Sequence, residues 1–157
     1  PICRSVLVVD AGTVLSLTRV DGEGRFRGGR LLAGAALQLR AMAAGTAALP
    51  DLSAARGGAV AADHAELLDP WPAATAAAML AGVAHGLVAA IAAAARDVQR
   101  AEGECRLLLT GGDGPLLRTS LEREIAAPMT LNWRPGLCLE ALAQLRPAGG
   151  AGEGPSH

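Results

Sequence analysis

Two glycine-containing motifs follow apolar runs and carry residue types that can bind phosphate. The first, Asp10-Ala-Gly-Thr13, comes directly after Ser5 to Val9, a short apolar run typical of a central strand. A carboxylate at the carboxyl end of such a strand lies where α/β sheets place their ligands. Gly12 lets a phosphate approach the backbone, and Thr13 offers hydroxyl and amide donors. Taken alone, the motif is more often just a turn.

The second motif, Thr110-Gly-Gly-Asp113, stands between an apolar strand and the start of a helix. Two glycines at that point would let a nucleotide pack against bare backbone beside a helix N-terminus. A third segment, Gly28-Gly29 followed by Gly34, again clears space before a helix. Each segment by itself is as well explained by a turn, a bulge or close packing.

The elements that must position these motifs are indicated by hydrophobic patterning and by turn residues. The expected strands are Ser5–Val9, Val14–Val20, Arg25–Leu32, Cys105–Thr110 and Met129–Asn132, and the expected helices are Ala35–Gly45, Ala73–Arg100, one spanning Leu117 to Ile125, and Leu137–Leu145. This order, β-β-β-α-α-β-α-β-α, predicts a single α/β domain, residues 1–146, with a mixed sheet covered by helices. Residues 147–157 are expected to be a disordered tail.

Composition excludes several classes of protein. The 157 residues include 14 Arg, no Lys and 15 acidic residues, and a net charge of −1 argues against nucleic-acid binding. A hydrophobic share of 51% excludes disorder along the whole chain. Three cysteines and three histidines show no metal-ligand spacing, so we expect reduced thiols, a cytosolic protein and no metal site. Cys105 and Cys138 are expected to be buried and inert. The clustered Arg25, Arg27 and Arg30 are expected to be solvated and able to attract an anion.

The alanine-rich segment Ala73–Ala95 is long enough to cross a bilayer, because its 23 residues carry no formal charge. It also contains Gly82 and Gly86 in the small-xxx-small spacing that lets helices touch. Alanine gains little from lipid, however, and His85 lies near the middle of the segment. We therefore expect a helix buried in the fold or in a dimer interface, and no membrane span.

Taken together, the segments resemble the type III pantothenate kinases of the actin-like kinase superfamily, from Ser5 to about Leu145. The matching segments are Val8-Val-Asp10-Ala-Gly-Thr13, Glu23-Gly-Arg-Phe-Arg-Gly28-Gly29 with Gly34, Gly45-Thr-Ala-Ala-Leu-Pro50, the spacing of Thr75, Gly82 and Gly86, Leu109-Thr-Gly-Gly-Asp113, and Leu137-Cys-Leu-Glu-Ala-Leu142. The resemblance implies an actin-like (ribonuclease H-like) fold. It also implies ATP-dependent phosphorylation of pantothenate, the first step of coenzyme A synthesis.

The resemblance implies roles for the residues of the first and second motifs. Asp10 would be the base that takes the proton from the primary hydroxyl of pantothenate, since phosphoryl transfer needs positioning, charge neutralisation and a proton acceptor. Gly12 and Thr13 would face the transferred phosphate. Gly111 and Gly112 would face the adenosine.

The resemblance also implies a substrate pocket, cofactors and an assembly. Gly29 and Gly34 would shape the pantothenate pocket, and Thr75 would donate a hydrogen bond to the substrate. The cofactors would be ATP, Mg²⁺ and a monovalent cation, K⁺ or NH₄⁺. The protein would be a cytoplasmic homodimer, with the helix carrying Gly82 and Gly86 as a contributor to its interface.

Two departures from the family pattern qualify this reading. The family's N-terminal half, with its first phosphate motif and a Gly-x-Asp-Arg stretch, has no counterpart here, so we expect a fragment that is inactive alone. Ala33 replaces a family proline, which makes that turn less rigid. Two other functions stay open: a non-catalytic transcriptional accessory protein of the same superfamily, and an actin-like kinase for a different hydroxyl substrate.

Overall fold

The computed structural model describes residues 4–53, 69–125 and 129–145. The strands are β1 (Ser5–Ala11), β2 (Val14–Val20), β3 (Phe26–Ala33), β4 (Cys105–Thr110) and β5 (Thr130–Trp133), and the helices are α1 (Ala35–Gly45), α3 (Thr75–Glu102), α4 (Gly114–Glu124) and α5 (Leu137–Gln144). The elements follow one another in the expected order. The expected tail, residues 147–157, lies outside the described residues.

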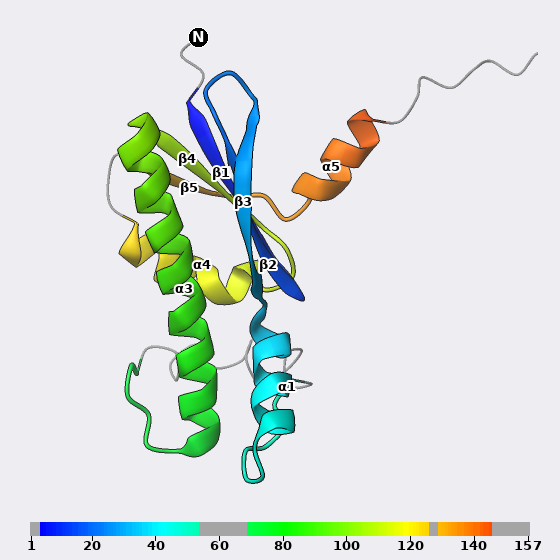
Figure 1. Cartoon of the computed structure of the whole chain (residues 1–157), viewed down its shortest axis with the longest axis vertical. Helices are drawn as coiled ribbons and strands as arrows, with labels where there is room; N and C mark the ends of the chain where they lie inside the picture. The colour runs from blue at the N-terminus through cyan, green and yellow to red at the C-terminus, as the bar shows by residue number, and fades with distance from the viewer. Residues whose placement is uncertain (1–3, 54–68, 126–128, 146–157) are drawn as a thin grey trace, which may run out of the picture.

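The five strands form one mixed sheet in the order β3-β2-β1-β4-β5 (Figure 1). β1 pairs antiparallel with β2, and β2 with β3, whereas β1 and β4 run parallel, as do β4 and β5. In the parallel register of β1 and β4, Asp10 stands opposite Thr110. The sheet therefore brings the carboxyl ends of these two strands, and the motifs that follow them, to the same edge.

One face of the sheet carries most of the core. Side chains alternate along β1, so Leu7, Val9 and Ala11 are buried on one face, while Asp10 is half-buried on the other. The long helix α3 covers the buried face and contacts β1, β2 and β4, with α1 and α4 packed beside it. Figure 1 shows α5 on the opposite side of the sheet from α3. The two faces are thus unequally covered, and the carboxylate of Asp10 points to the thinner side.

The boundaries of α3 and α4 have local causes. Gly103 ends α3 at a φ of 79° and donates its N–H to the carbonyl of Gln99 at 2.8 Å, as a glycine C-cap does. Pro115 lies in the first turn of α4, where its missing N–H costs nothing. In the part of the chain that the structure describes, α3 is the one helix long and apolar enough to cross a membrane. Buried side chains such as Leu87 and Ile91 pack it against the sheet, as in a core helix.

Candidate functional site

The carboxylate of Asp10 and the glycine turn after β4 meet at the edge of the sheet. Gly111 has a φ of 93°, which favours glycine. A Cβ atom at Gly111 would lie 2.6 Å from Oδ1 of Asp10, and closer still to the carbonyl oxygen of Ala11. The bare backbone of this turn therefore lies directly against β1, beside the Asp10 side chain.

Backbone hydrogen bonds hold this turn in place. The N–H of Asp113 donates to the carbonyl of Ala11 at 2.8 Å, and the N–H of Gly114 donates to the carbonyl of Gly111 at 3.1 Å. Because α4 begins at Gly114, the positive end of its dipole opens at this edge. Gly112 has no atom within 4 Å of the place where its Cβ would be, so its backbone is open to a ligand. We call Asp10, Ala11 and the turn from Gly111 to Asp113 the nucleotide edge, after the ligand that the sequence motifs predict there.

The first and third glycine segments also meet. The N–H of Gly34 donates to the carbonyl of Thr13 at 2.9 Å. A Cβ at Gly34 would lie 2.8 Å from that same oxygen and nearer still to the carbonyl oxygen of Gly12. Real Cβ atoms essentially never come within 3.0 Å of another atom, so only glycine fits at position 34. The structure therefore places Gly12, Thr13 and Gly34 together beside the end of β1.

The other predicted site residues lie elsewhere. Gly29 stands inside β3 opposite Thr18, about 16 Å along an extended strand from Gly34. A Cβ at Gly29 would collide with the carbonyl oxygen of Leu17, so this glycine serves close strand packing. Thr75 is the first residue of α3 and is exposed.

Cys138 was expected to be buried, and this expectation is wrong. The residue is exposed on α5, and its Sγ lies 3.7 Å from Oδ2 of Asp10. Partial desolvation at this contact raises the pKa of Cys138, and the charge of Asp10 and its hydrogen bond act in the same direction. Cys105, by contrast, is buried as expected, and burial raises the pKa of its thiol. Sequence patterning missed Cys138 because 128 positions separate it from Asp10.

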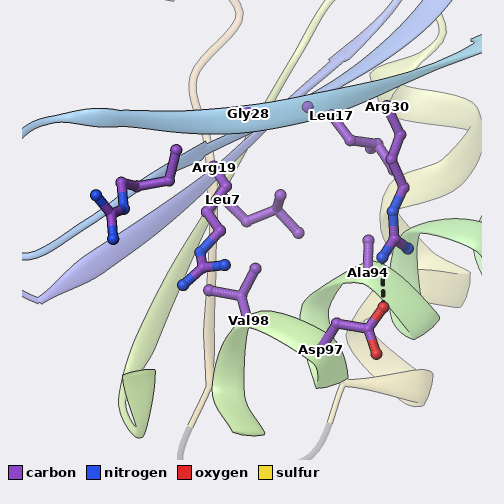
Figure 2. A pocket seen from close by; sticks show the side chains of 10 residues that line it. Leu7, Leu17, Arg19, Gly28, Arg30, Ala94, Asp97 and Val98 are labelled. Atoms are coloured by element: carbon purple, nitrogen blue, oxygen red, sulfur yellow. Dashed lines mark hydrogen bonds and ion pairs between the residues drawn. The ribbon is translucent and has the colours of Figure 1, made fainter. Parts of the chain in front are cut away.

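A second candidate region lies at the other end of the sheet, between β3 and α3. It is a hollow of about 330 Å³ lined by Arg19, Arg27 and Arg30 from two strands and by Asp97 from α3, above an apolar floor that includes Leu7 (Figure 2). We call it the arginine hollow. Its charge and volume would suit a small anion.

The charges of the arginine hollow are already paired within the chain. Arg30 donates to Asp97 at 2.5 Å, as the dashed line in Figure 2 marks. Nε of Arg27 lies 3.6 Å from a carboxylate oxygen of Asp21. The remaining pairs are Arg19 with Glu102 and Arg25 with Glu23. The expected arginine cluster is therefore solvent-exposed in part, but its charge is balanced by carboxylates.

Within the described ranges, no three His, Cys, Asp or Glu side chains come close enough to hold a metal ion. His64 lies outside the described residues, and His85 is exposed on α3. The carboxylates at the nucleotide edge are Asp10 and Asp113. The edge can therefore supply a carboxylate as proton acceptor, bare backbone for a phosphate or base, and a helix N-terminus.

Comparison with known proteins relates this geometry to a family. A family model described as type III pantothenate kinase matches residues 2–97. A protein named type III pantothenate kinase from Synechococcus sp. (strain JA-3-3Ab) is 39% identical over 140 residues, covering 89% of this chain and 53% of the relative. One of the same name from Alkalilimnicola ehrlichii is 38% identical over 141 residues, covering 88% of this chain and 49% of the relative. The chain thus spans about half the length of the curated relatives it matches.

A solved structure shows a similar fold. It is a Campylobacter jejuni protein named as a Baf family transcriptional activator, with a TM-score of 0.58 over 90% of this chain and 57% of that one. At 20% sequence identity, this likeness concerns the fold alone.

Proposed function

The chain belongs to the type III pantothenate kinase family, and from this premise we propose that it supplies the catalytic carboxylate and the nucleotide edge of an ATP-dependent pantothenate kinase. The observation that carries the proposal is the parallel pairing of β1 with β4, which sets Asp10 opposite Thr110 and against the backbone of Gly111. An acid and a proposed adenosine-binding turn that come from distant parts of the chain thereby share one edge.

The proposed reaction transfers the γ-phosphoryl group of ATP to the primary hydroxyl of pantothenate. Asp10 accepts the hydroxyl proton as the oxygen attacks, a role that contributes about 10²–10⁴-fold. Gly12 and Thr13 line the phosphate, and Gly111 and Gly112 the adenosine, while Gly34 and Thr75 belong to the pantothenate side. Gly29 acts on that pocket only through the packing of β3, because it stands away from the edge.

The proposed cofactors are ATP with Mg²⁺ and a monovalent cation, K⁺ or NH₄⁺. The nucleotide suits this edge, since the backbone of Gly112 is open and α4 presents its N-terminus. Mg²⁺ usually binds through one or two carboxylates together with substrate phosphates, and Asp113 is the carboxylate of this edge besides the proposed base. When bound, Mg²⁺ would neutralise charge on the phosphates.

We also propose that the fold is the actin-like, ribonuclease H-like one. The sheet order β3-β2-β1-β4-β5 supports it, because the antiparallel meander β1-β2-β3 forms one half of the sheet and the parallel strands β1, β4 and β5 form the other. Turnover then needs the half of the family protein that this chain does not match. α5 supports this division, because none of its residues is buried and Leu139, Leu142 and Leu145 are 73%, 64% and 78% exposed. Those leucines would be covered in the whole enzyme.

The proposed assembly is a cytoplasmic homodimer that contacts its partner through α3. Gly82 and Gly86 are exposed and open on this helix, so a second helix could approach closely. A hollow of about 500 Å³ adjoins them, lined mainly by Pro70, Trp71, Pro72 and alanines of α3. Trp71 is 88% exposed there, which suits an apolar contact surface.

A chimaera tests the proposal. The chain is joined to the half of the 39% identical Synechococcus relative that it does not match, and ATP-dependent phosphorylation of pantothenate is measured. We expect turnover by the chimaera, none by the chain alone, and a strong loss with Asp10→Asn. A folded chimaera that phosphorylates a different alcohol would redirect the substrate assignment. One that binds ATP without transferring phosphate would favour a non-catalytic regulator.

A further inference from the structure

The side chain of Asp10 is held from two sides by parts of the chain that are far apart in sequence. Its Oδ1 faces Gly111, because a Cβ atom placed on Gly111 would lie only 2.6 Å from this oxygen. Its Oδ2 lies 3.7 Å from Sγ of Cys138 on α5, with the thiol as the donor and the carboxylate as the acceptor. The two oxygens of one carboxylate thus have different environments.

We propose that Cys138 is a positioning residue for Asp10. Its S–H engages Oδ2, which fixes the orientation of the carboxylate and leaves Oδ1 on the side of the nucleotide edge. This inference rests on the proposed function, in which Asp10 is the proton acceptor. The contact also connects α5, the last described helix, to the site, although α5 buries none of its own residues in the core.

A thiol suits this task because it donates a hydrogen bond without adding charge. An arginine or lysine at the same place would stabilise the ionised carboxylate strongly and weaken it as a base. Desolvation and the nearby Asp10 raise the pKa of Cys138, so the thiol keeps its proton at neutral pH and stays a donor. The other acid on α5, Glu140, is ion-paired with Arg134. Asp113, across the turn, has interactions of its own.

The contact is tested directly by the reactivity of the Cys138 thiol in the chain as it exists. Iodoacetamide labelling at pH 8, resolved by peptide mass spectrometry, is compared between wild type and Asp10→Asn. We expect labelling of Cys138 to become about fivefold faster in the variant, because removing a unit charge about 4 Å away shifts a thiol–thiolate equilibrium by about that factor in water. Buried Cys105 is an internal control whose labelling should not change.

Glu140→Gln is the matched control variant, since it also removes one acid from the neighbourhood but leaves the Cys138–Asp10 contact. Its Cys138 should label at the wild-type rate, with circular dichroism confirming that the helices are retained. Equal labelling of Cys138 in wild type and Asp10→Asn would overturn the inference, whatever the kinase assay shows.

The positioning role is then tested in the chimaera. We expect Cys138→Ala to lower kcat about tenfold with the KM for ATP unchanged, because a misoriented base slows the chemical step. Cys138→Ser, which keeps a donor, should recover most of the loss. An unchanged kcat in Cys138→Ala would show a contact without a positioning role. Thiol labelling that responds to Asp10→Asn in a chimaera without turnover would instead count against the proposed function.

Discussion

The nucleotide edge and the arginine hollow lie toward opposite ends of the same sheet and use charge differently. In the hollow, Arg30 is held by Asp97, and Arg27 faces Asp21, so each cation meets an acid of the same chain. At the edge, the described residues place no arginine in an ion pair with Asp10, which accepts a hydrogen bond from the neutral thiol of Cys138. The richer cluster of charges is therefore the less available for chemistry.

The glycines of the two regions differ in the same way. Gly28 in the hollow and Gly111 at the edge both have positive φ values, 104° and 93°. Around Gly28 there is open space, whereas Gly111 is pressed against the backbone of Ala11 and the side chain of Asp10. The first glycine serves strand geometry alone. The second also brings two loops into contact, which is why the edge can form a site.

The largest difference is expected in turnover. In the chimaera, Asp10→Asn should lower kcat by about 10²–10⁴-fold, because the amide cannot accept the substrate proton. The matched variant Asp97→Asn, which makes the same change in the hollow, should leave kcat unchanged. A loss below about threefold for Asp10→Asn, or equal losses for both variants, would contradict the contrast between the two regions.

The next largest difference is expected in the stability of alanine variants at Gly111 and Gly28. Gly111→Ala should lower the free energy of unfolding by about 3–5 kcal/mol, since it combines a strained φ with a backbone collision. Gly28→Ala meets open space and should cost about 1–2 kcal/mol, from the strained φ alone. Urea denaturation of both variants measures the gap. Equal losses of stability in the two variants would mean that the turn after β4 can move to accommodate a Cβ atom at Gly111.

The smallest expected effect is a pH dependence in the hollow. Hydrogen bonds from Arg30, and then from Arg100, lower the pKa of Asp97 below its ordinary value of 3.8. A lowered pKa in the folded state means that these pairs stabilise the fold above about pH 4 and stop doing so as pH falls through the lowered value. Urea denaturation should therefore show a slightly lower free energy of unfolding for Asp97→Asn than for wild type at pH 7, and this gap should close in acid, below the lowered pKa. The gap should also shrink in 1 M salt. A gap that persists in acid would show that another contact is responsible.

Local patterning was sufficient for much of the fold. Apolar runs and alternation predicted every described strand to within about two residues. These features depend on neighbours in sequence, so they can be read from it. The roles of the motif residues came from family resemblance and stay predictions.

Other features could not be read from the chain. Arg30 and Asp97 are 67 positions apart, and nothing in either segment indicates that one would neutralise the other. Gly29 and Gly34 belong to one motif, yet Gly29 lies in the middle of β3 and Gly34 directly after its end. Cys138 was misjudged because an apolar-looking helix normally hides its cysteine in a core, and α5 instead lies on the thinly covered face of the sheet.

By itself, the sequence determined which segments become strands and helices and which glycines permit close approach, because φ preferences and hydrophobic periodicity act over a few residues. Only the tertiary structure decided which charges would meet. Sheet order and helix packing bring together residues that are far apart in the sequence. Which distant segments meet cannot be inferred from the few residues around each of them, because the loops between them can close over very different lengths. The acid beside a bare turn, and the thiol that touches it, are products of that assembly.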